Sequence, residues 1–441
     1  IIIIMLVPIF GLFLYIAWGG NKISQRMKKF APTLRASFEK HLPPDPEISE
    51  AFLDEYPEYT RISRYLELCG YPLTEGGNPE YLPLGELFFD RMIADMKKAE
   101  KTIFIQFFII ADGEIWHRIF AVLREKVRAG VEVRVMYDDG GSLFTVHSHF
   151  RRELEEAGIK VQVFNPVHKS VASLYFNYRN HQKIAIIDGN IGYTGGINVG
   201  DEYANITSPR GHWKDTGIRV TGDSVWTMTV VYLQMWDQIL EQYMESYDAY
   251  RPTIRSAGKG YFQFFADGPA NNPENPALQT YLQMITTAKD YIYITSPYLI
   301  LSDHMMSSLK HAAESGVDVR IFTTHVRDHW YVHLETRSFY GNLLESGVRV
   351  YEYTPGFLHC KMVVSDDKAA IVGSINMDYR SFFLQYECAY WMCGTPAVMD
   401  VKQDILEIME KSEEIQLEAW KKRPFYVKAA ETVLRLAAPL F

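Results

Sequence analysis

Short apolar runs alternate with amphipathic segments along most of the chain, and this pattern occurs twice. The corresponding segments are 99–105 (AEKTIFI) with 288–294 (AKDYIYI), 129–135 (AGVEVRV) with 315–321 (SGVDVRI), and 154–164 (LEEAGIKVQVF) with 343–353 (LLESGVRVYEY). Short apolar runs separated by helical patterns predict β-strands that alternate with α-helices. We therefore expect an α/β fold built from two pseudo-symmetric halves, each a mixed, mostly parallel sheet flanked by helices.

The repeat also predicts how the chain divides. We expect the first half over residues 76–252 and the second over 253–415, because residues near their junction include the loop-like stretch ADGPANNPENP. Residues 19–75 would connect an N-terminal segment to the first half. Residues 416–441 begin basic and end in an amphipathic apolar run, which either lies at a membrane interface or packs as a helix on the domain body.

The chain opens with an uncharged apolar run, IIIIMLVPIFGLFLYIAW, over residues 1–18. At ~1.5 Å per residue such a helix is about 27 Å long, close to the hydrocarbon thickness of a bilayer. We predict an N-terminal transmembrane helix over residues 1–18, with a buried core helix as the alternative. The flank NKISQRMKK (21–29) is basic and places the rest of the chain on the cytoplasmic side. The run lacks an initiator methionine, which is consistent with an N-terminally trimmed sequence.

Composition narrows the functional classes. The formal net charge of −9 argues against a non-specific nucleic-acid binder, whose affinity would rest on lysine and arginine paired with phosphates. An anionic substrate would need a local basic pocket. Aromatic content of 14% is high for a soluble enzyme and suggests that something apolar is handled at the surface. The four cysteines have no CxxC spacing, which favours a reducing compartment.

The chemistry-bearing residues lie in a motif that also occurs twice. HQKIAIIDGNIGYTGGIN (181–198) and HCKMVVSDDKAAIVGSIN (359–376) match position for position. The matched pairs are His181 with His359, Lys183 with Lys361, Asp188 with Asp366, and Asn198 with Asn376. On a strand, residues two apart project to the same face, so each half offers one imidazole beside one ammonium.

This pairing of residue types indicates which chemistry the motif supports. A lysine two residues from a histidine is a poor metal ligand and repels cations, so a metal site is disfavoured. Lysines and asparagines around two histidines suit an anionic, phosphorus-centred transition state. One histidine can attack phosphorus while the other protonates the leaving oxygen and then deprotonates the incoming hydroxyl. The alternative, that both histidines are ordinary core residues, is disfavoured by their identical frames.

The doubled frame HxKx4Dx6G(G/S)xN resembles the phospholipase D superfamily, and the whole chain is similar to its bacterial cardiolipin synthases. Four further stretches carry the similarity: GHWKDTGIRVTGDSV (211–225), SPYLILSDHMMSSLKHAAESGVDVRI (296–321), DHWYVHLETRSFYGNLLESGVRVYEY (328–353) and GSINMDYRSFFLQYECAYWM (373–392). The resemblance implies two phospholipase D-like halves. One departure is Gln106, where similar enzymes often have an acid.

The resemblance also implies a role for each site residue. His181 would be the nucleophile that forms a phosphatidyl-histidine intermediate, and His359 the general acid and then base. A carboxylate downstream of each histidine would orient it, with Asp215 and Glu387 at suitable distances. The side chains expected to hold the phosphate oxygens are Lys183, Lys361, Asn198 and Asn376. Asp188 and Asp366 complete the catalytic motifs and would brace the strand turns, and Arg380 would add a local cation for substrate or pair with an acid.

The implied reaction is phosphatidyl transfer between two phosphatidylglycerol molecules, which gives cardiolipin and glycerol in the cell membrane of a bacterium. Bond types are conserved in this exchange, so we expect no cofactor, no nucleotide and no metal, and the chain has no GxxxxGK[ST] motif. Its partners would be phosphatidylglycerol and membrane lipids. The alternatives are a phospholipase D-type hydrolase, a phosphatidylserine synthase, a membrane-tethered nuclease, and a catalytically inactive lipid-binding scaffold.

Overall fold

The computed structural model describes residue 11 and residues 36–167, 177–255, 258–269 and 274–435. The transmembrane helix predicted over residues 1–18 lies outside the described residues, apart from residue 11. Within the described residues, no helix is both long enough and apolar enough to cross a membrane. The end of the predicted C-terminal tail, residues 436–441, also lies outside them.

The first repeat forms a seven-stranded sheet among the described residues. Its strands, in spatial order, are β2 (Glu80–Leu82), β9 (Gly217–Thr221), β8 (Ile191–Gly195), β7 (Ile184–Ile187), β3 (Thr102–Phe107), β4 (Glu132–Asp138) and β5 (Lys160–Phe164). The three predicted strands of this half are β3, β4 and β5, and they pair in parallel. The motif strand β7 joins them antiparallel through β3.

The second repeat builds a larger sheet, ten-stranded over the described residues. Its order is β1 (Thr74–Glu75), β10 (Tyr261–Asp267), β16 (Gln385–Cys393), β15 (Ala369–Gly373), β14 (Met362–Ser365), β11 (Tyr291–Thr295), β12 (Asp318–Thr324), β13 (Arg349–Tyr353) and β17 (Ser412–Glu414). The tenth strand, β6 (Arg179–Asn180), comes from the first repeat and pairs in parallel with β16. A segment of the first half is therefore part of the sheet of the second half.

The α/β architecture and the two related halves are confirmed, but the mostly parallel pairing is wrong. Apart from the short pair of β6 with β16, the parallel pairs are confined to the three strands before each motif, and the motif strands pair antiparallel with their neighbours. The cause is the tight turn that follows each motif strand. A turn this short can join only antiparallel strands, whereas a parallel pair needs a long crossover.

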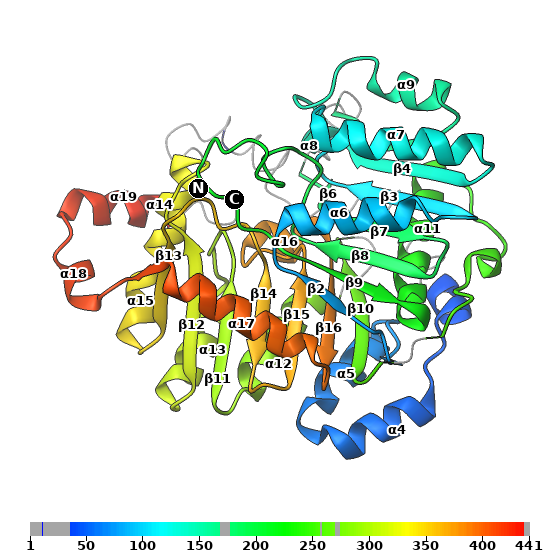
Figure 1. The fold of residues 1–441 in the computed structure, drawn as a ribbon. Helices are drawn as coiled ribbons and strands as arrows, with labels where there is room; N and C mark the ends of the chain where they lie inside the picture. Colours follow the sequence, from blue (N-terminus) through cyan, green and yellow to red (C-terminus); the bar gives the residue numbers. More distant parts are fainter. Residues whose placement is uncertain (1–10, 12–35, 168–176, 256–257, 270–273, 436–441) are drawn as a thin grey trace.

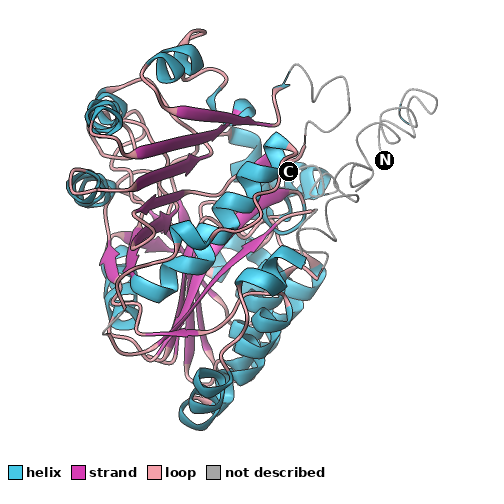
Figure 2. Ribbon diagram, turned by 90° about the vertical axis from the view of Figure 1, so that its right-hand side faces the viewer, coloured by secondary structure: helices cyan, strands magenta, loops and turns pink. Residues whose placement is uncertain are grey.

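Helices cover both sheets (Figures 1 and 2). Those before the second sheet are α4 (Pro46–Glu55), α5 (Thr60–Leu68), α6 (Gly85–Met96), α7 (Glu114–Arg128), α8 (Asp139–Ser142), α9 (Phe150–Glu156) and α11 (Val225–Leu240), with 3-10 turns η1 (Pro57–Tyr59), η2 (Gly222–Ser224) and η3 (Asp248–Tyr250). Those of the second half and tail are α12 (Pro276–Thr287), α13 (Asp303–Glu314), α14 (Trp330–Ser338), α15 (Tyr340–Glu345), α16 (Tyr379–Phe383), α17 (Ala397–Glu410), α18 (Leu417–Lys421) and α19 (Phe425–Arg435).

Two peripheral segments pack on the second half. Helix α5, from the predicted connection, contacts α12 and β10, and the Gln263 amide of β10 donates to backbone carbonyls of Ser63 and Tyr71. Helix α19 of the tail contacts α14. The described part of the tail therefore packs on the body, which was one of the two alternatives for this segment.

Helix α11 lies between the sheets. It contacts β7 and β8 of the first sheet and β10 of the second. Residues 225–238 of this helix are all buried, as expected for a helix that is apolar on every side. The helix ends at Glu241, whose left-handed φ of 57° stops the helical path. The core cluster that contains α11 therefore takes residues from both halves, while a second cluster belongs almost wholly to the first half.

This packing predicts unequal costs for two leucine truncations in α11. Leu233 is 0% exposed, whereas Leu240, at the end of the helix, is 39% exposed. Leu233→Ala should lower the free energy of unfolding by about 2–5 kcal/mol because it leaves a cavity, and Leu240→Ala by less than about 1 kcal/mol. Denaturant unfolding of both variants measures the difference. Equal costs would contradict the central position of α11.

Candidate active site

The two halves meet at a pocket of about 590 Å³, and both motif histidines line it. Asn198 and Asn376 line the same pocket. His181 directly precedes the residues that lead into β7, and His359 stands in the same relation to β14. Strand β8 of the first sheet contacts β15 and β16 of the second, so the two motif regions are brought together.

An exchange of backbone hydrogen bonds fixes the position of each histidine. The amide of His181 donates to the carbonyl of Tyr386 at 2.8 Å and extends the pairing of β6 with β16. The amide of His359 donates to the carbonyl of Lys214, also at 2.8 Å. Each acceptor is the residue directly before a carboxylate residue. The exchange therefore places each histidine beside a carboxylate of the other half.

Each imidazole is held by that carboxylate. Nδ1 of His181 lies 2.9 Å and 3.0 Å from the carboxylate oxygens of Glu387, and Nδ1 of His359 lies 2.6 Å from Oδ2 of Asp215. Both carboxylates are 0% exposed. With Nδ1 engaged, Nε2 is the ring atom left for a substrate. Both predicted carboxylates are thus brought to histidines, and the pairs cross between the halves. The expectation of a carboxylate downstream of each histidine is wrong for His359, whose partner Asp215 lies upstream of it.

Each carboxylate also contacts the Gly/Ser position of a motif, and the residue found there matches the length of the Asp or Glu side chain. The Ser374 hydroxyl donates to the Glu387 carboxylate and accepts from the Cys388 amide at 3.0 Å. The matching position in the first motif is Gly196, where a Cβ would lie 2.3 Å from Oδ1 of Asp215. Any side chain there would displace the shorter aspartate. The Gly/Ser difference between the motifs therefore follows from the pairing with Asp and Glu.

Asp215 and His359 form an ionised carboxylate beside a neutral imidazole. Burial raises the pKa of Asp215, but the interactions with His359, including its hydrogen bond, and the charge of Lys361 outweigh it, so the pKa lies below its ordinary value. Burial and then Lys361 lower the pKa of His359 to about 4, although Asp215 acts in the opposite direction. An anion bound in the pocket would raise the pKa of His359.

The second pair has a different balance. Burial raises the pKa of Glu387 to about 8, against the opposing effect of the Lys183 charge. Burial, together with the charges of Lys183 and Lys361, holds the pKa of His181 well below its ordinary value. His181 is therefore a neutral imidazole at pH 7, with Nδ1 directed at Glu387.

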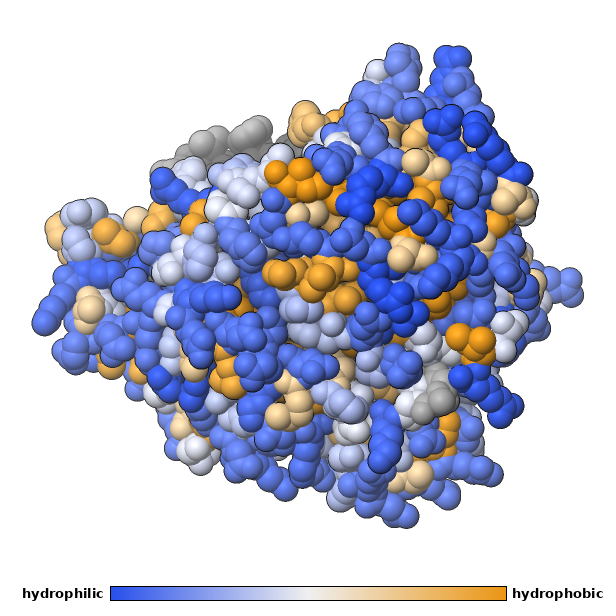
Figure 3. Space-filling model, viewed as in Figure 1, coloured by the Kyte–Doolittle hydropathy of each residue, from blue (hydrophilic) through white to orange (hydrophobic). Residues whose placement is uncertain are grey.

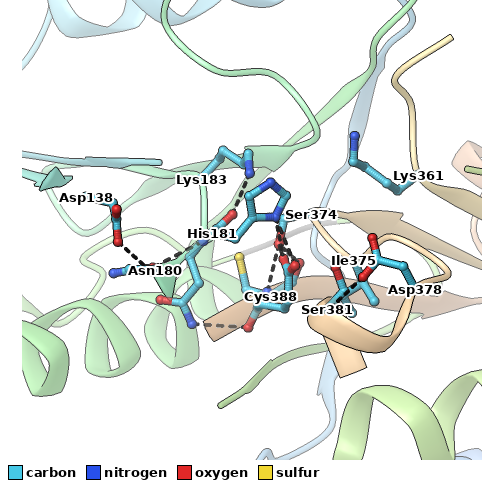
Figure 4. A network of polar contacts seen from close by, with 12 residues as sticks. Asp138, Asn180, His181, Lys183, Lys361, Ser374, Ile375, Asp378, Ser381 and Cys388 are labelled. Carbon is cyan, nitrogen blue, oxygen red and sulfur yellow. Dashed lines mark hydrogen bonds and ion pairs between the residues drawn. The ribbon is translucent and has the colours of Figure 1, made fainter. Parts of the chain in front are cut away.

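Each motif lysine contacts the backbone carbonyl of the histidine in its own motif. The ammonium of Lys183 donates to the carbonyl of His181 at 2.6 Å, and that of Lys361 donates to the carbonyl of His359. Figure 4 shows Lys183 and Lys361 on either side of His181. Burial lowers the pKa of Lys183 to about 7 and that of Lys361 to about 8. The described lining of the pocket includes neither lysine.

The two asparagines are not equally free. Oδ1 of Asn198 accepts from the amide of Ile109 at 3.1 Å, and its Nδ2 donates to the Tyr203 hydroxyl at 3.0 Å. Oδ1 of Asn376 is buried without a hydrogen-bond partner among the described residues. Asn376 is therefore the more available of the two for a ligand in the pocket.

The motif aspartates lie outside the described lining of the pocket, at the far ends of their strands. Asp188 accepts from three consecutive amides, those of residues 100–102, at 2.7–2.9 Å. Asp366 does the same with residues 289–291 at 2.8–3.0 Å. Both have left-handed φ angles, 53° and 52°, at the tight turn after the strand. This geometry matches the expected bracing role, and these side chains do not reach the histidines' pocket.

Aromatic side chains enclose the histidines, and the motif alone did not identify them. The ring of Phe108 lies edge-on to His181 with centroids 5.0 Å apart. Tyr203, Trp213 and Phe357 surround His359 at centroid distances of 5.4–5.9 Å. Trp213 lies two residues before Asp215 and Phe357 two before His359. Their closeness in sequence to Asp215 and His359 is the signal by which Trp213 and Phe357 could have been predicted.

Arginines supply positive charge at both sides of the pocket. Arg380 lines it and contributes to the lowered pKa of His181. Its guanidinium donates to the Asn177 carbonyl at 3.4 Å. Arg210 also lines the pocket and lies near Tyr203, on the side of His359. Within the described residues, neither arginine has a carboxylate within ion-pair distance. Arg380 was expected from the sequence, whereas Arg210 was not.

Gln106, the departure in the first repeat, serves a structural purpose. Its amide donates to Oδ1 of Asn180 at 3.1 Å and to Oε1 of Gln182 at 2.6 Å. These residues flank His181 in the chain. Among the described residues, no group of three or more His, Cys, Asp or Glu side chains is arranged to hold a metal ion.

The buried ammonium of Lys183 predicts that Lys183→Met stabilises the protein while it removes activity. The pKa of Lys183 falls from 10.5 to about 7 on folding, so the cost of burying the charge is complete below about pH 7 and fades as pH rises towards 10.5. Thermal unfolding should give the variant a higher Tm at about pH 6, by about 5 °C, and a smaller difference at about pH 9.5.

Lys101→Met is the matched control, because Lys101 is exposed. It should leave Tm unchanged at both pH values. A lower Tm for Lys183→Met at about pH 6 would mean that the ammonium stabilises the fold, contrary to the burial argument.

Comparison with known proteins agrees with this geometry. The model of the family described as "Cardiolipin synthase, PLD-like domain" matches residues 92–206 and 281–409. A cardiolipin synthase of Geobacillus kaustophilus is 36% identical over 98% of this chain and 86% of its own length. One from Listeria monocytogenes is 33% identical over 100% of this chain and 92% of its own.

A solved structure shares the fold at low sequence identity. The phosphatidylserine synthase of Haemophilus influenzae superposes with a TM-score of 0.66 at 14% identity, covering 87% of this chain and 100% of that one. The doubled motif, the family match to both halves and the full-length relatives agree: the chain belongs to the cardiolipin synthase family of phospholipase D-like proteins.

Proposed function

We propose that this protein is a cardiolipin synthase, which transfers the phosphatidyl group of one phosphatidylglycerol to a second and releases glycerol. The observation that carries this proposal is the pair of histidines in one pocket, each held at Nδ1 by a buried carboxylate. Two imidazoles with free Nε2 atoms supply a nucleophile and an acid–base group together. The cardiolipin synthases related to the chain over nearly its whole length support the choice of substrate.

In the first step, His181 attacks the donor lipid. Its Nδ1–H is directed at Glu387, so the lone pair of Nε2 can form a bond to phosphorus. The bond from phosphorus to the glycerol oxygen breaks, and that oxygen takes the Nε2 proton of a protonated His359. The products are phosphatidyl-histidine, free glycerol and neutral His359.

In the second step, a hydroxyl of the acceptor phosphatidylglycerol attacks the same phosphorus. His359 takes the hydroxyl proton, the new phosphorus–oxygen bond forms, and the bond to His181 breaks. His359 must therefore alternate between imidazole and imidazolium. The ionised Asp215 beside it stabilises the charged form, which supports this assignment of the two histidines.

The surrounding charges suit a reaction between two anionic lipids. Lys183 and Lys361, whose ammonium groups contact the histidine carbonyls, and the amide nitrogen of Asn376 would stabilise the reacting phosphate oxygens. The charge of the bound phosphate would restore the ammonium form of both lysines. Arg380, on the side of His181, and Arg210, on the side of His359, offer cations for the donor and the acceptor respectively. A pure hydrolase would need only one phosphate to be neutralised.

The aromatic enclosure favours transfer over hydrolysis. Phe108 covers the side of His181, while Tyr203, Trp213 and Phe357 cover the side of His359. Apolar walls limit the access of water to the intermediate, which a lipid hydroxyl can then intercept. The proposed location is a bacterial cell membrane, with residues 1–18 as the span and the catalytic halves on the cytoplasmic side.

The proposal predicts the products made from vesicles of phosphatidylglycerol without added nucleotide or metal. Cardiolipin and glycerol should form in equal amounts, as measured by mass spectrometry of the lipid and aqueous phases. His181→Ala and His359→Ala should each lower the rate by at least about 10³-fold. Phosphatidic acid with glycerol and no cardiolipin would instead identify a phospholipase D-type hydrolase.

The roles of the two histidines predict different responses to the leaving group. Phosphatidyl-p-nitrophenol releases a phenolate that needs little protonation, so the His359→Ala enzyme should still release p-nitrophenol in the first turnover. His181→Ala should not, because it lacks the nucleophile. Rapid-mixing absorbance measurements record this burst. A burst in His181→Ala and none in His359→Ala would reverse the assignment.

A further inference from the structure

A second cavity, of about 540 Å³, lies away from the two histidines. We refer to it as the basic cavity. Its lining comes from the segment before α14, from α14 itself, from α19, and from Arg423, two positions before α19. The lining residues are His325, Val326, Arg327, His333, Leu334, Arg337, Arg423, Val427 and Glu431. This lining holds three guanidinium groups and two imidazoles against one carboxylate. A cavity of this size is in the range that binds small ligands.

Not all of this positive charge is neutralised by the protein. Arg423 is held by Glu431, with one of its two hydrogen bonds at 2.9 Å. Arg337 lies 3.5 Å from Glu352, which is behind the lining and also 3.0 Å from His325. Arg327 is exposed and has no carboxylate within ion-pair distance in the described part of the chain.

A buried polar atom in the same lining lacks a partner. Nε2 of His333 is buried and makes no hydrogen bond with the described residues. Burial lowers the pKa of His333, so the empty cavity favours its neutral form. An anion in the cavity would favour the protonated ring, whose Nε2–H could then donate to it, and would supply the missing counter-charge for Arg327.

Exposed aromatic side chains stand at the start of both helices that form the basic cavity. Trp330, the first residue of α14, is 60% exposed, and Phe425 and Tyr426, at the start of α19, are 82% and 65% exposed. Apolar side chains also appear among hydrophilic ones over α18 and α19 in Figure 3. Large aromatic residues beside cationic ones are typical of a surface that meets the headgroup region of a membrane.

We propose that the basic cavity binds the phosphate group of an anionic phospholipid in the membrane, as a headgroup site separate from the catalytic pocket. The net charge of −9 opposes approach of this protein to an anionic surface. A local cluster of arginines is therefore needed wherever the protein does contact such lipids. This inference goes beyond the proposed function, because the site takes no part in the transfer reaction.

The basic cavity and the catalytic pocket are separated by residues 325–333, and a lipid bound in one is not bound in the other. Along residues 325–333, His325, Val326, Arg327 and His333 line the basic cavity, whereas Asp328, His329, Tyr331 and Val332 line the catalytic pocket. A headgroup in the basic cavity is thus on the opposite side of this segment from the motif histidines. It cannot present its phosphorus to His181, so the bound lipid is not a substrate in that position.

The test counts binding sites on the full chain in a neutral detergent, in the His181→Ala background to prevent turnover. Isothermal titration with dihexanoyl-phosphatidylglycerol should show two sites, one in each cavity, because in this background the glycerol of the donor does not leave and an acceptor lipid cannot take its place. Arg327→Glu should weaken one of them by at least about tenfold and leave the other unchanged. Arg61→Glu, the same charge reversal at an exposed position in the first turn of α5, should preserve both.

A second variant keeps the test independent of Arg327. Val427→Glu places a carboxylate in the cavity from α19 and should also remove one site. Dihexanoyl-phosphatidylcholine should occupy neither site tightly, and inorganic phosphate should bind the basic cavity at least about tenfold more weakly than the lipid. A single site in the parent chain, or two sites in both variants, would overturn the proposal. Equal affinity for inorganic phosphate would show that the cavity takes the free anion.

If the parent chain has one site and both variants keep it, the basic cavity binds no lipid while the catalytic pocket still does. If the variants lose one site but vesicles yield no cardiolipin, the headgroup site stands and the proposed activity fails. The two proposals can therefore fail separately.

Discussion

The catalytic pocket depends on two backbone hydrogen bonds, each of which joins the histidine of one half to a strand or loop residue of the other half. The amides of His181 and His359 each donate to the other half, at the residue directly before Glu387 or Asp215. These two backbone bonds set the register from which both imidazole–carboxylate pairs follow. A half in isolation would contain a histidine and a carboxylate that belong to different pairs. Duplication of the unit within one chain thus keeps both partners of each pair at a fixed stoichiometry.

The site is assembled at an electrostatic cost that the rest of the fold must offset. Two lysines, two histidines and two carboxylates are buried together, and desolvation is the largest influence on the pKa of each of them. Only the complementary charges within the group make this tolerable. The large shared core around α11 supplies stability elsewhere, which is the usual relation between an active site and its scaffold.

Much of this arrangement could be predicted from the sequence, because local patterns determine it. The repeated apolar runs identified the parallel strands, and the doubled motif identified the two histidines and their lysines. Pairing across the halves could not be predicted, because Asp215 and Glu387 are each separated from their histidine by more than a hundred residues, at 144 and 206 positions. Only the fold brings such residues together.

The errors and omissions have similar physical causes. The mostly parallel sheet was predicted from the strands before each motif, but the short turns at Asp188 and Asp366 reverse the chain and make the following pairs antiparallel. Arg210 and Arg327 belong to no sequence motif, since each matters because no carboxylate among the described residues lies within ion-pair distance of it. The absence of a neighbour is a three-dimensional property that sequence spacing does not encode.

The burial of α11 against both sheets has a consequence for motion. Two lobes that swing about a hinge need a boundary across which few contacts would be broken, and here a helix with residues 225–238 buried crosses that boundary. Hinge opening would expose this helix to water. Ligand entry and exit must therefore depend on small displacements at the rim of the pocket, whose lining includes Asp328, His329, Tyr331 and Val332. The enzyme body acts as a rigid frame, and the lipids are the parts that move.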